Sequence, residues 1–124
     1  MGTGLSNLIV YQKAFELAMN IFIISKSFPK EEMYSLTDQI RRSSRAVCAN
    51  LAEGYAKRRY TAYFISKMSD ANMENTETQV WLGFANKCGY IHNEDYQKYY
   101  DQSIEVGNLI NYMIKYPNKF SAKS

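Results

Sequence analysis

The feature that most constrains the fold is an apolar stripe near the N-terminus with the period of an α-helix. From residue 7 to residue 28, apolar side chains recur at alternating steps of four and three, which places them on one helical face. The stripe consists of Val10, Ala14, Leu17, Ile21, Ile24 and Phe28. A second apolar stripe beside it consists of Tyr11, Phe15, Ala18 and Phe22. The double stripe indicates either a helix buried deeply within one molecule or a helix that also contacts a neighbouring subunit.

Three further segments carry the same period, which predicts helices over 35–56, 61–88 and 93–115 in addition to 7–28. The expected breaks coincide with a proline or a glycine, residues that commonly end helices. No segment has the alternating pattern of a strand. The sequence therefore predicts an all-α fold, an antiparallel up-down-up-down four-helix bundle in a single domain over 1–124. Residues 117–124 are expected to form a frayed tail.

Finer features of the helices are also predicted. The expected N-terminal caps are Ser35 (with Asp38 three residues later), Thr61 and Asn93. The inner stripe of the fourth helix is expected to be Tyr96, Tyr100, Ser103, Gly107, Ile110 and Ile114. Polar side chains near the apolar side of the second helix must be paired if they are buried. We expect Gln39, Asn50 and Glu53 to form such a hydrogen-bonded network, which fixes helix register or subunit contacts.

The residues do not favour catalysis, a metal site or a cofactor. The single histidine, His92, lies in a predicted turn, where an exposed position is expected, and one histidine cannot build a typical metal site or triad. Cys48 and Cys88 match no metal or redox spacing, so we expect buried, reduced thiols and a cytoplasmic protein. The most apolar run is much shorter than the ~20 residues of a membrane span.

Basic residues are concentrated in one part of the chain. Six positive charges fall within nineteen residues, at Arg41, Arg42, Arg45, Lys57, Arg58 and Arg59. Guanidinium groups suit phosphate oxygens, so the concentration is a candidate nucleic-acid interface, with Tyr55 and Tyr60 beside it to stack on bases. The alternative is a solvated face, neutralised in part by Asp38. In a ring of identical subunits, the same residues form a broad basic surface.

Several segments resemble one known family. They are Tyr11-Gln12-Lys13-Ala14, Phe28-Pro29-Lys30-Glu31-Glu32 followed by Tyr34 and Leu36, Gln39-Ile40-Arg41-Arg42, Asn50-x-Ala52-Glu53-Gly54 and Glu77-Thr78-Gln79. In this order they resemble the bacterial four-helix bundle proteins of 23S ribosomal RNA intervening sequences, also labelled S23. The resemblance extends from Leu8 to Ile114, which is nearly the whole chain.

The resemblance implies a left-handed antiparallel bundle that forms a homopentamer, in a family whose molecular role is poorly defined. It also implies a shared fold with the accessory protein of diversity-generating retroelements, a basic pentamer that binds nucleic acid and a reverse transcriptase. Arg41 and Arg42 match the family pattern, whereas the other four basic residues depend on the charge argument alone. The chain departs from the pattern at Tyr11, Cys48, Tyr60 and Asn75, where tryptophan, proline, serine and glutamate are usual.

Two functional hypotheses follow. The first is a non-enzymatic homo-oligomeric scaffold whose basic face binds RNA or DNA. The second is a protein–protein interaction module without nucleic-acid binding. The two differ in whether a polyanion or another protein covers the basic residues.

Overall fold

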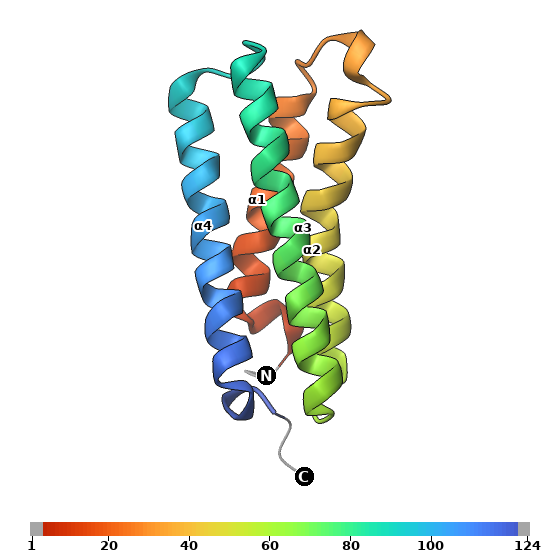
Figure 1. Ribbon diagram of the computed structural model, residues 1–124, viewed down its shortest axis with the longest axis vertical. Helices are drawn as coiled ribbons and strands as arrows, with labels where there is room; N and C mark the ends of the chain where they lie inside the picture. The colour runs from red at the N-terminus through yellow and green to blue at the C-terminus, as the bar shows by residue number, and fades with distance from the viewer. Residues whose placement is uncertain (1–3, 122–124) are drawn as a thin grey trace.

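The computed structural model describes residues 4–121, and all regular elements in this part of the chain are helices (Figure 1). It contains the α-helices α1 (Ile9–Ser25), α2 (Leu36–Ala56), α3 (Thr61–Lys87) and α4 (Asn93–Lys115). Three short 3-10 helices lie outside them: η1 (Leu5–Asn7), η2 (Lys30–Glu32) and η3 (Pro117–Lys119). No strand occurs among the described residues, so the predicted all-α class is confirmed.

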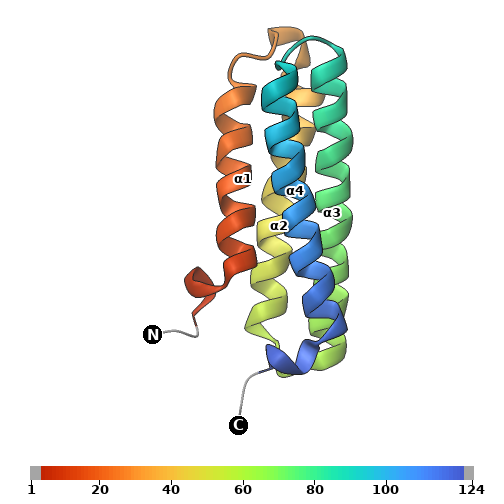
Figure 2. The same cartoon turned by 90° about the vertical axis from the view of Figure 1, so that its left-hand side faces the viewer.

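Consecutive α-helices are joined at alternate ends of the molecule (Figures 1 and 2). The α1–α2 and α3–α4 connections lie at one end, which we call the upper end. The α2–α3 connection, η1 and η3 lie at the other, the lower end. Helices α1 and α3 each pack on both α2 and α4, and therefore occupy opposite corners of the bundle.

The first helix is shorter than the sequence predicts at both ends. It begins at Ile9 because the preceding residues form the separate turn η1. It ends at Ser25 because the next residues bond three positions back, from Lys26 N to Ile23 O (3.2 Å) and from Phe28 N to Ser25 O (3.1 Å). This tighter turn still leaves Phe28 buried in the core.

None of the three expected residues caps its helix. Thr61 and Asn93 are the first residues of α3 and α4. At α2, Ser35 occupies the N-cap position, but its Oγ donates a hydrogen bond to Glu32 Oε1 (2.6 Å). The same carboxylate oxygen accepts a hydrogen bond from Leu36 N (3.3 Å). Glu32 thus replaces the predicted capping box, because η2 brings its carboxylate to the start of α2, where the helix dipole favours negative charge.

The core consists of two apolar clusters, one toward each end. The lower cluster includes Leu51, Phe64 and Ile110, and the upper cluster includes Ile21 and Leu82. A polar layer contributed by α2, α3 and α4 is also buried. In this layer Asn75 Nδ2 donates to the carbonyl of Ser103 (2.8 Å), and Ser103 Oγ donates to Asn75 Oδ1 (2.8 Å).

The predicted inner stripe of α4 is partly wrong. Ser103 and Ile110 are buried, but Val106 and Met113 complete the buried set, whereas Tyr96, Tyr100, Gly107 and Ile114 are only partly buried. The buried arc faces α1 and α3, and the half-buried tyrosines lie at its edge. Helices α3 and α4 approach closely at Gly107, since a Cβ there would lie 3.2 Å from Asn75 Nδ2.

The C-terminal tail is more ordered than predicted as far as residue 121. Pro117 opens η3, and the ring of Phe120 then stacks on that of Phe64, with centroids 6.4 Å apart. This contact closes the lower end of the core. Residues 122–124 of the predicted frayed tail lie outside the described residues.

The prediction for the two cysteines is also partly wrong. Cys48 is half-buried on α2, and Cys88 is exposed at the C-terminal end of α3. Burial raises the pKa of the Cys48 thiol to about 11. Cys88 is exposed because it lies almost one turn beyond Ala85, the last buried residue of α3.

Candidate nucleic-acid interface

The six basic residues predicted to bind nucleic acid belong to two separate groups. Arg41, Arg42 and Arg45 lie in the first half of α2. Lys57, Arg58 and Arg59 lie in the α2–α3 connection at the lower end. The twelve residues from Arg45 to Lys57 place the two groups about 18 Å apart along the helix at ~1.5 Å per residue. A continuous basic face is therefore not formed within one molecule.

The first group holds α1 against α2. Arg41 Nε donates a hydrogen bond to Ser25 Oγ (2.8 Å), and its guanidinium lies 4.8 Å from the centroid of the Phe22 ring. The guanidinium of Arg45 lies 5.4 Å from the same centroid. These contacts explain why the predicted second stripe of α1 ends in an aromatic residue, since Phe22 packs beneath two cations.

Arg42 lies on the α3 side of α2. It is exposed, and its positive charge acts on the carboxyl group of Glu74 in α3. The pKa of Glu74 is nevertheless raised, mainly by burial and then by the charge of Glu77, with Arg42 opposing both effects. Each arginine of the first group therefore acts on a neighbouring helix.

The second group combines cations with tyrosine rings. The guanidinium of Arg58 lies 4.0 Å from the centroid of Tyr55, and its Nη1 donates to the carbonyl of the same residue (2.9 Å). Arg59 lies 5.7 Å from the Tyr60 centroid, and Lys57 lies 5.2 Å from the Tyr63 centroid. No carboxylate of the described residues forms an ion pair with this group.

Two further lysines at the same end were missed by the sequence analysis. Lys119 Nζ donates to the hydroxyl of Tyr112 (2.7 Å) and lies 4.9 Å from the Tyr116 centroid. Lys115 Nζ lies 5.5 Å from the same ring. The predicted topology could have placed these two lysines at the lower end, because the second and fourth helices of an up-down bundle end on the same side. We call these five cations and the tyrosines whose rings they contact the basic-aromatic end. It consists of Lys57, Arg58, Arg59, Lys115 and Lys119 with Tyr55, Tyr60, Tyr63, Tyr112 and Tyr116.

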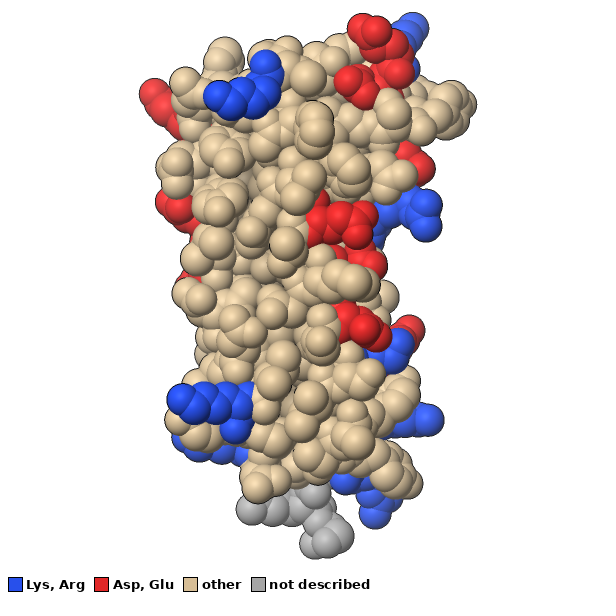
Figure 3. All heavy atoms as spheres, in the orientation of Figure 1, with Lys and Arg blue, Asp and Glu red and all other residues tan. Residues whose placement is uncertain are grey.

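Charge is distributed unevenly along the bundle. Figure 3 shows basic atoms on both sides of the lower end and no acidic atoms there on the visible face. Acidic side chains of the opposite end include Glu31 and Glu32 in η2 and Glu94 and Asp95 in the first turn of α4. The net charge of +3 thus understates the positive potential at the lower end.

The predicted polar network of Gln39, Asn50 and Glu53 is not assembled. Glu53 is exposed, and its carboxylate pairs with Lys67 Nζ at 2.8 Å. Asn50 Nδ2 donates to the carbonyl of Ala46 in its own helix (3.0 Å). Gln39 lines a surface hollow near the upper end, three helical turns from Asn50. Two other groups of polar side chains are hydrogen-bonded inside the bundle: Asn75, Ser103 and Gln79 between α3 and α4, and Thr78 and Ser43 between α3 and α2.

Within residues 4–121, no three histidine, cysteine or acidic side chains lie close enough to hold a metal ion. His92 is exposed at the N-cap position of α4. None of the α-helices in this part of the chain is long and apolar enough to span a membrane.

Comparison with known proteins identifies the family of the chain. A model of the 23S rRNA-intervening sequence protein family matches residues 6–112. The chain belongs to this family. Among solved structures, it is similar to a protein of unknown function from the S23 ribosomal protein family of Bacteroides thetaiotaomicron. The two share 30% identity and a TM-score of 0.78 over 86% of this chain and 98% of the other. No functionally curated protein is significantly similar in sequence.

One departure from the pattern of this 23S rRNA-intervening sequence protein family has a clear structural consequence. Asn75, where the resemblance implies a glutamate, is 2% exposed and holds two hydrogen bonds to Ser103. A neutral amide satisfies this site as both donor and acceptor. The polar layer of this member therefore needs no buried charge at Asn75.

The outer surfaces of α1 and α3 are also notable, because both carry large exposed apolar side chains. On α1 these are Ile9 (59% exposed), Phe15 (51%), Met19 (44%) and Ile23 (60%). On α3 they are Met73 (59%), Val80 (48%) and Phe84 (55%). We call them the α1 face and the α3 face. They lie at opposite corners of the bundle. Burial within one molecule accounts for the double stripe of α1 except at Phe15, and the other exposed apolar residues of the α1 face belong to neither stripe.

Proposed function

We propose that this family member is a non-enzymatic, homo-oligomeric scaffold that binds single-stranded RNA or DNA through its basic-aromatic end. The observation that carries the proposal is the pairing of cations with tyrosine rings at one end of the bundle, without a carboxylate among their described ion-pair partners. Proteins that bind single strands combine positive charge, which attracts phosphates, with aromatic rings on which bases stack.

Individual side chains have distinct roles in this proposal. Lys57 and Arg59 are exposed and bind phosphate oxygens. Tyr60 is 59% exposed and Tyr63 is 37% exposed, so a base can stack on either ring. Arg58 orients the group, because its guanidinium is held against Tyr55.

Self-association is supported by the two apolar faces. A two-fold dimer joins identical patches, whereas a ring joins two different patches of neighbouring copies. The α1 face and the α3 face are different and lie at opposite corners of the bundle. We therefore propose that the antiparallel up-down-up-down bundles pack side by side with one face on the other, each copy rotated relative to the last so that a ring closes. The family resemblance implies five copies, a homopentamer. In a ring whose axis is parallel to the helices, the basic-aromatic ends of all copies lie on the same side of the ring.

The test is a fluorescence-anisotropy titration of a labelled single-stranded oligonucleotide. The variant is Lys57→Gln, Arg59→Gln, Lys119→Gln, which removes three charges from the lower end. Its matched control is Lys30→Gln, Lys87→Gln, Lys98→Gln, which removes three exposed charges from the upper half. We expect the variant to lose about tenfold or more in affinity and its salt dependence to become shallower by about 2 in log–log slope, with the control close to wild type.

Two outcomes contradict the proposal. Equal losses in the variant and the control mean that only total charge matters. A loss confined to Arg42→Gln, Arg45→Gln places the interface along the middle of α2 instead.

A protein partner is the second candidate, favoured by one observation. Met33 and Tyr34, beside η2, are 50% and 90% exposed and lie near a hollow lined by Trp81 and Phe84. Stoichiometric capture of one protein by the wild-type chain, lost in Tyr34→Ser and insensitive to nuclease, would select this candidate.

A further inference from the structure

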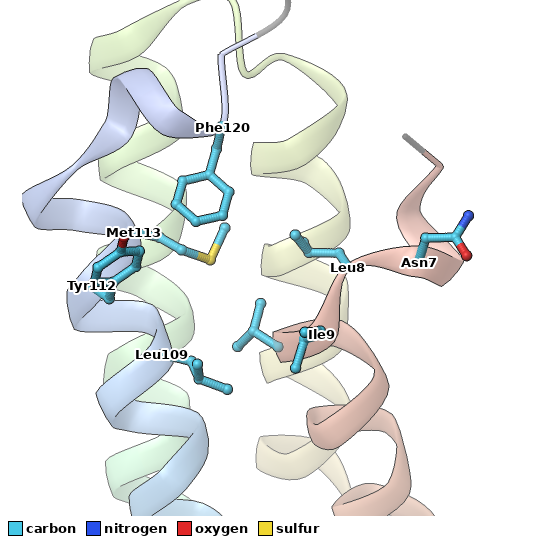
Figure 4. A pocket seen from close by; sticks show the side chains of 8 residues that line it. Asn7, Leu8, Ile9, Leu109, Tyr112, Met113 and Phe120 are labelled. Carbon is cyan, nitrogen blue, oxygen red and sulfur yellow. The ribbon is translucent and has the colours of Figure 1, made fainter. Parts of the chain in front are cut away.

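An apolar pocket opens at the lower end of the bundle, on the α1–α4 side (Figure 4). Its volume is about 330 Å³, at the lower end of the range for small-molecule sites. The lining residues are Asn7, Leu8, Ile9, Val10, Leu109, Tyr112, Met113 and Phe120. Apart from one amide and one phenol, the walls are hydrocarbon, thioether or aromatic ring.

The pocket exists because one corner of the bundle is incomplete at this level. Helix α1 begins only at Ile9, and η1 lies to the side of the bundle instead of extending α1 downward (Figure 2). Helix α4 continues past Met113 toward the lower end, and η3 then carries Phe120 back over the gap (Figure 4). A turn of α1 that would cover this part of α4 is therefore missing, and Leu8 and Phe120 form the walls in its place.

The polar side chains of the pocket are Asn7 and Tyr112, which lie on opposite sides of it (Figure 4). The Tyr112 hydroxyl accepts a hydrogen bond from Lys119 Nζ at 2.7 Å, so a positive charge lies beside a lining residue. No lining residue is acidic. The nearest acidic residue along α4, Glu105, lies one turn above Leu109 and pairs with Lys13 (3.1 Å). A ligand that suits this arrangement has an apolar body and one negative charge.

We propose that the pocket binds a free medium-chain alkyl carboxylate. The alkyl chain lies between Leu8, Leu109 and Met113, and the carboxylate accepts hydrogen bonds from Lys119 Nζ and the Tyr112 hydroxyl. The site is independent of the nucleic-acid proposal, except that both use Lys119. Substitutions inside the pocket therefore separate the two.

The test is isothermal titration of the full chain with sodium hexanoate, octanoate and decanoate below their micellar concentrations. We expect one saturable site per chain and an affinity that rises about fourfold for each added methylene group, as burial of CH₂ predicts. Leu109→Trp, which fills the pocket, abolishes binding, whereas the matched control Ile104→Trp, at an exposed position of the same helix outside the pocket and both apolar faces, does not. Ile9→Trp at the pocket rim serves as the second filling variant if Leu109→Trp fails to fold by circular dichroism.

The head group is tested with Lys119→Gln. This variant loses the preference for decanoate over decanol, whereas the control Lys87→Gln keeps it. Nucleic-acid binding by Leu109→Trp at wild-type strength shows that the pocket is separate from the proposed interface.

The proposal is overturned by any of three results. Affinity independent of chain length excludes burial of the alkyl group. Unchanged decanoate binding in a folded Leu109→Trp or Ile9→Trp variant places the ligand elsewhere. If Leu109→Trp lowers the mass of the assembly and decanoate does not bind, a second copy of the chain occupies the pocket.

Discussion

Glu32 connects three parts of the upper end through a single carboxylate. It accepts hydrogen bonds from Ser35 Oγ (2.6 Å), from Leu36 N at the start of α2 (3.3 Å) and from the hydroxyl of Tyr90 (2.8 Å). The hydrogen bonds from Ser35 and then Tyr90 lower the pKa of Glu32 below its ordinary value of 4.5. The hydrogen bond to Glu32 raises the pKa of Tyr90 to about 12.

Because the pKa of Glu32 is lowered in the folded state, the free energy of unfolding depends on pH in the acidic range. Because the folded state favours the ionised form of Glu32, its stabilising effect is complete above pH 4.5 and is lost as the pH falls through the lower folded value. We expect Glu32→Gln to reduce the free energy of unfolding near neutral pH, and the difference from wild type to shrink in acid. Urea titrations at about pH 7 and about pH 3 measure this. A difference that stays constant over this range, or an equal effect of the control Glu31→Gln, contradicts the assignment.

The two cysteines are expected to react at different rates. Cys88 is exposed, whereas Cys48 is half-buried and burial raises its thiol pKa to about 11. Only the thiolate reacts with iodoacetamide, so at about pH 8 the native protein should be modified at Cys88 long before Cys48. Peptide mass spectrometry over time distinguishes the two sites, and denatured protein, in which both react, is the control. Comparable rates in the native state would show that Cys48 is accessible.

Only part of the candidate site could be predicted from the positions of its residues in the sequence. Lys57, Arg58 and Arg59 are adjacent in the sequence, so their grouping needs no fold. Lys119 joins them only because the chain returns to the same end after four helices. The contacts of Arg41 and Arg45 with Phe22 depend on the rotation of α1 relative to α2, which side-chain periodicity alone does not determine.

Among the elements, the polar layer between the two core clusters gives the next prediction. Ser103 Oγ donates to Asn75 Oδ1 and accepts from Gln79 Nε2 (3.0 Å), and Asn75 and Ser103 are almost fully buried. Ser103→Ala leaves the buried Asn75 Oδ1 and the half-buried Gln79 Nε2 short of a partner, so we expect a loss of about 1–3 kcal/mol in unfolding free energy. Ser69→Ala, at an exposed position of α3, should change stability by less than about 0.5 kcal/mol. Equal effects of both variants in urea unfolding would show that the layer contributes nothing specific.

The α1 face gives a prediction for assembly. Phe15→Glu, Ile23→Glu places two charges on its exposed apolar side chains without touching the core. We expect this variant to fold but to elute from size-exclusion chromatography as a smaller species than wild type. Met33→Glu, at a 50% exposed apolar position outside both faces, is the matched control. An unchanged elution volume for a folded Phe15→Glu, Ile23→Glu variant would exclude the α1 face as the subunit contact.

The helices were more predictable than their ends. The period of the apolar residues locates all four helices to within three residues of the expected bounds. Caps were not predictable in this way, since Glu32 reaches α2 only because η2 folds back. The buried arc of α4 also differed from prediction, because Tyr96 and Tyr100 satisfy the helical period equally well at the edge of the core as at its centre.

At the scale of the whole molecule, charge and apolar surface are arranged along different directions. Charge differs between the two ends, whereas the exposed apolar faces lie on the sides, at opposite corners. The proposed side-by-side packing of copies would therefore bury apolar surface without covering the basic-aromatic end. Repetition of that end around a ring multiplies a modest number of cations into a surface that can bind several phosphates at once.

Light scattering after size-exclusion chromatography, with and without single-stranded RNA, tests the central claim most directly. The account predicts a mass several times the 14.4 kDa of one chain, with five copies implied by the family resemblance, and a further increase when RNA is added at low salt. A folded protein that remains at 14.4 kDa in both samples contradicts it.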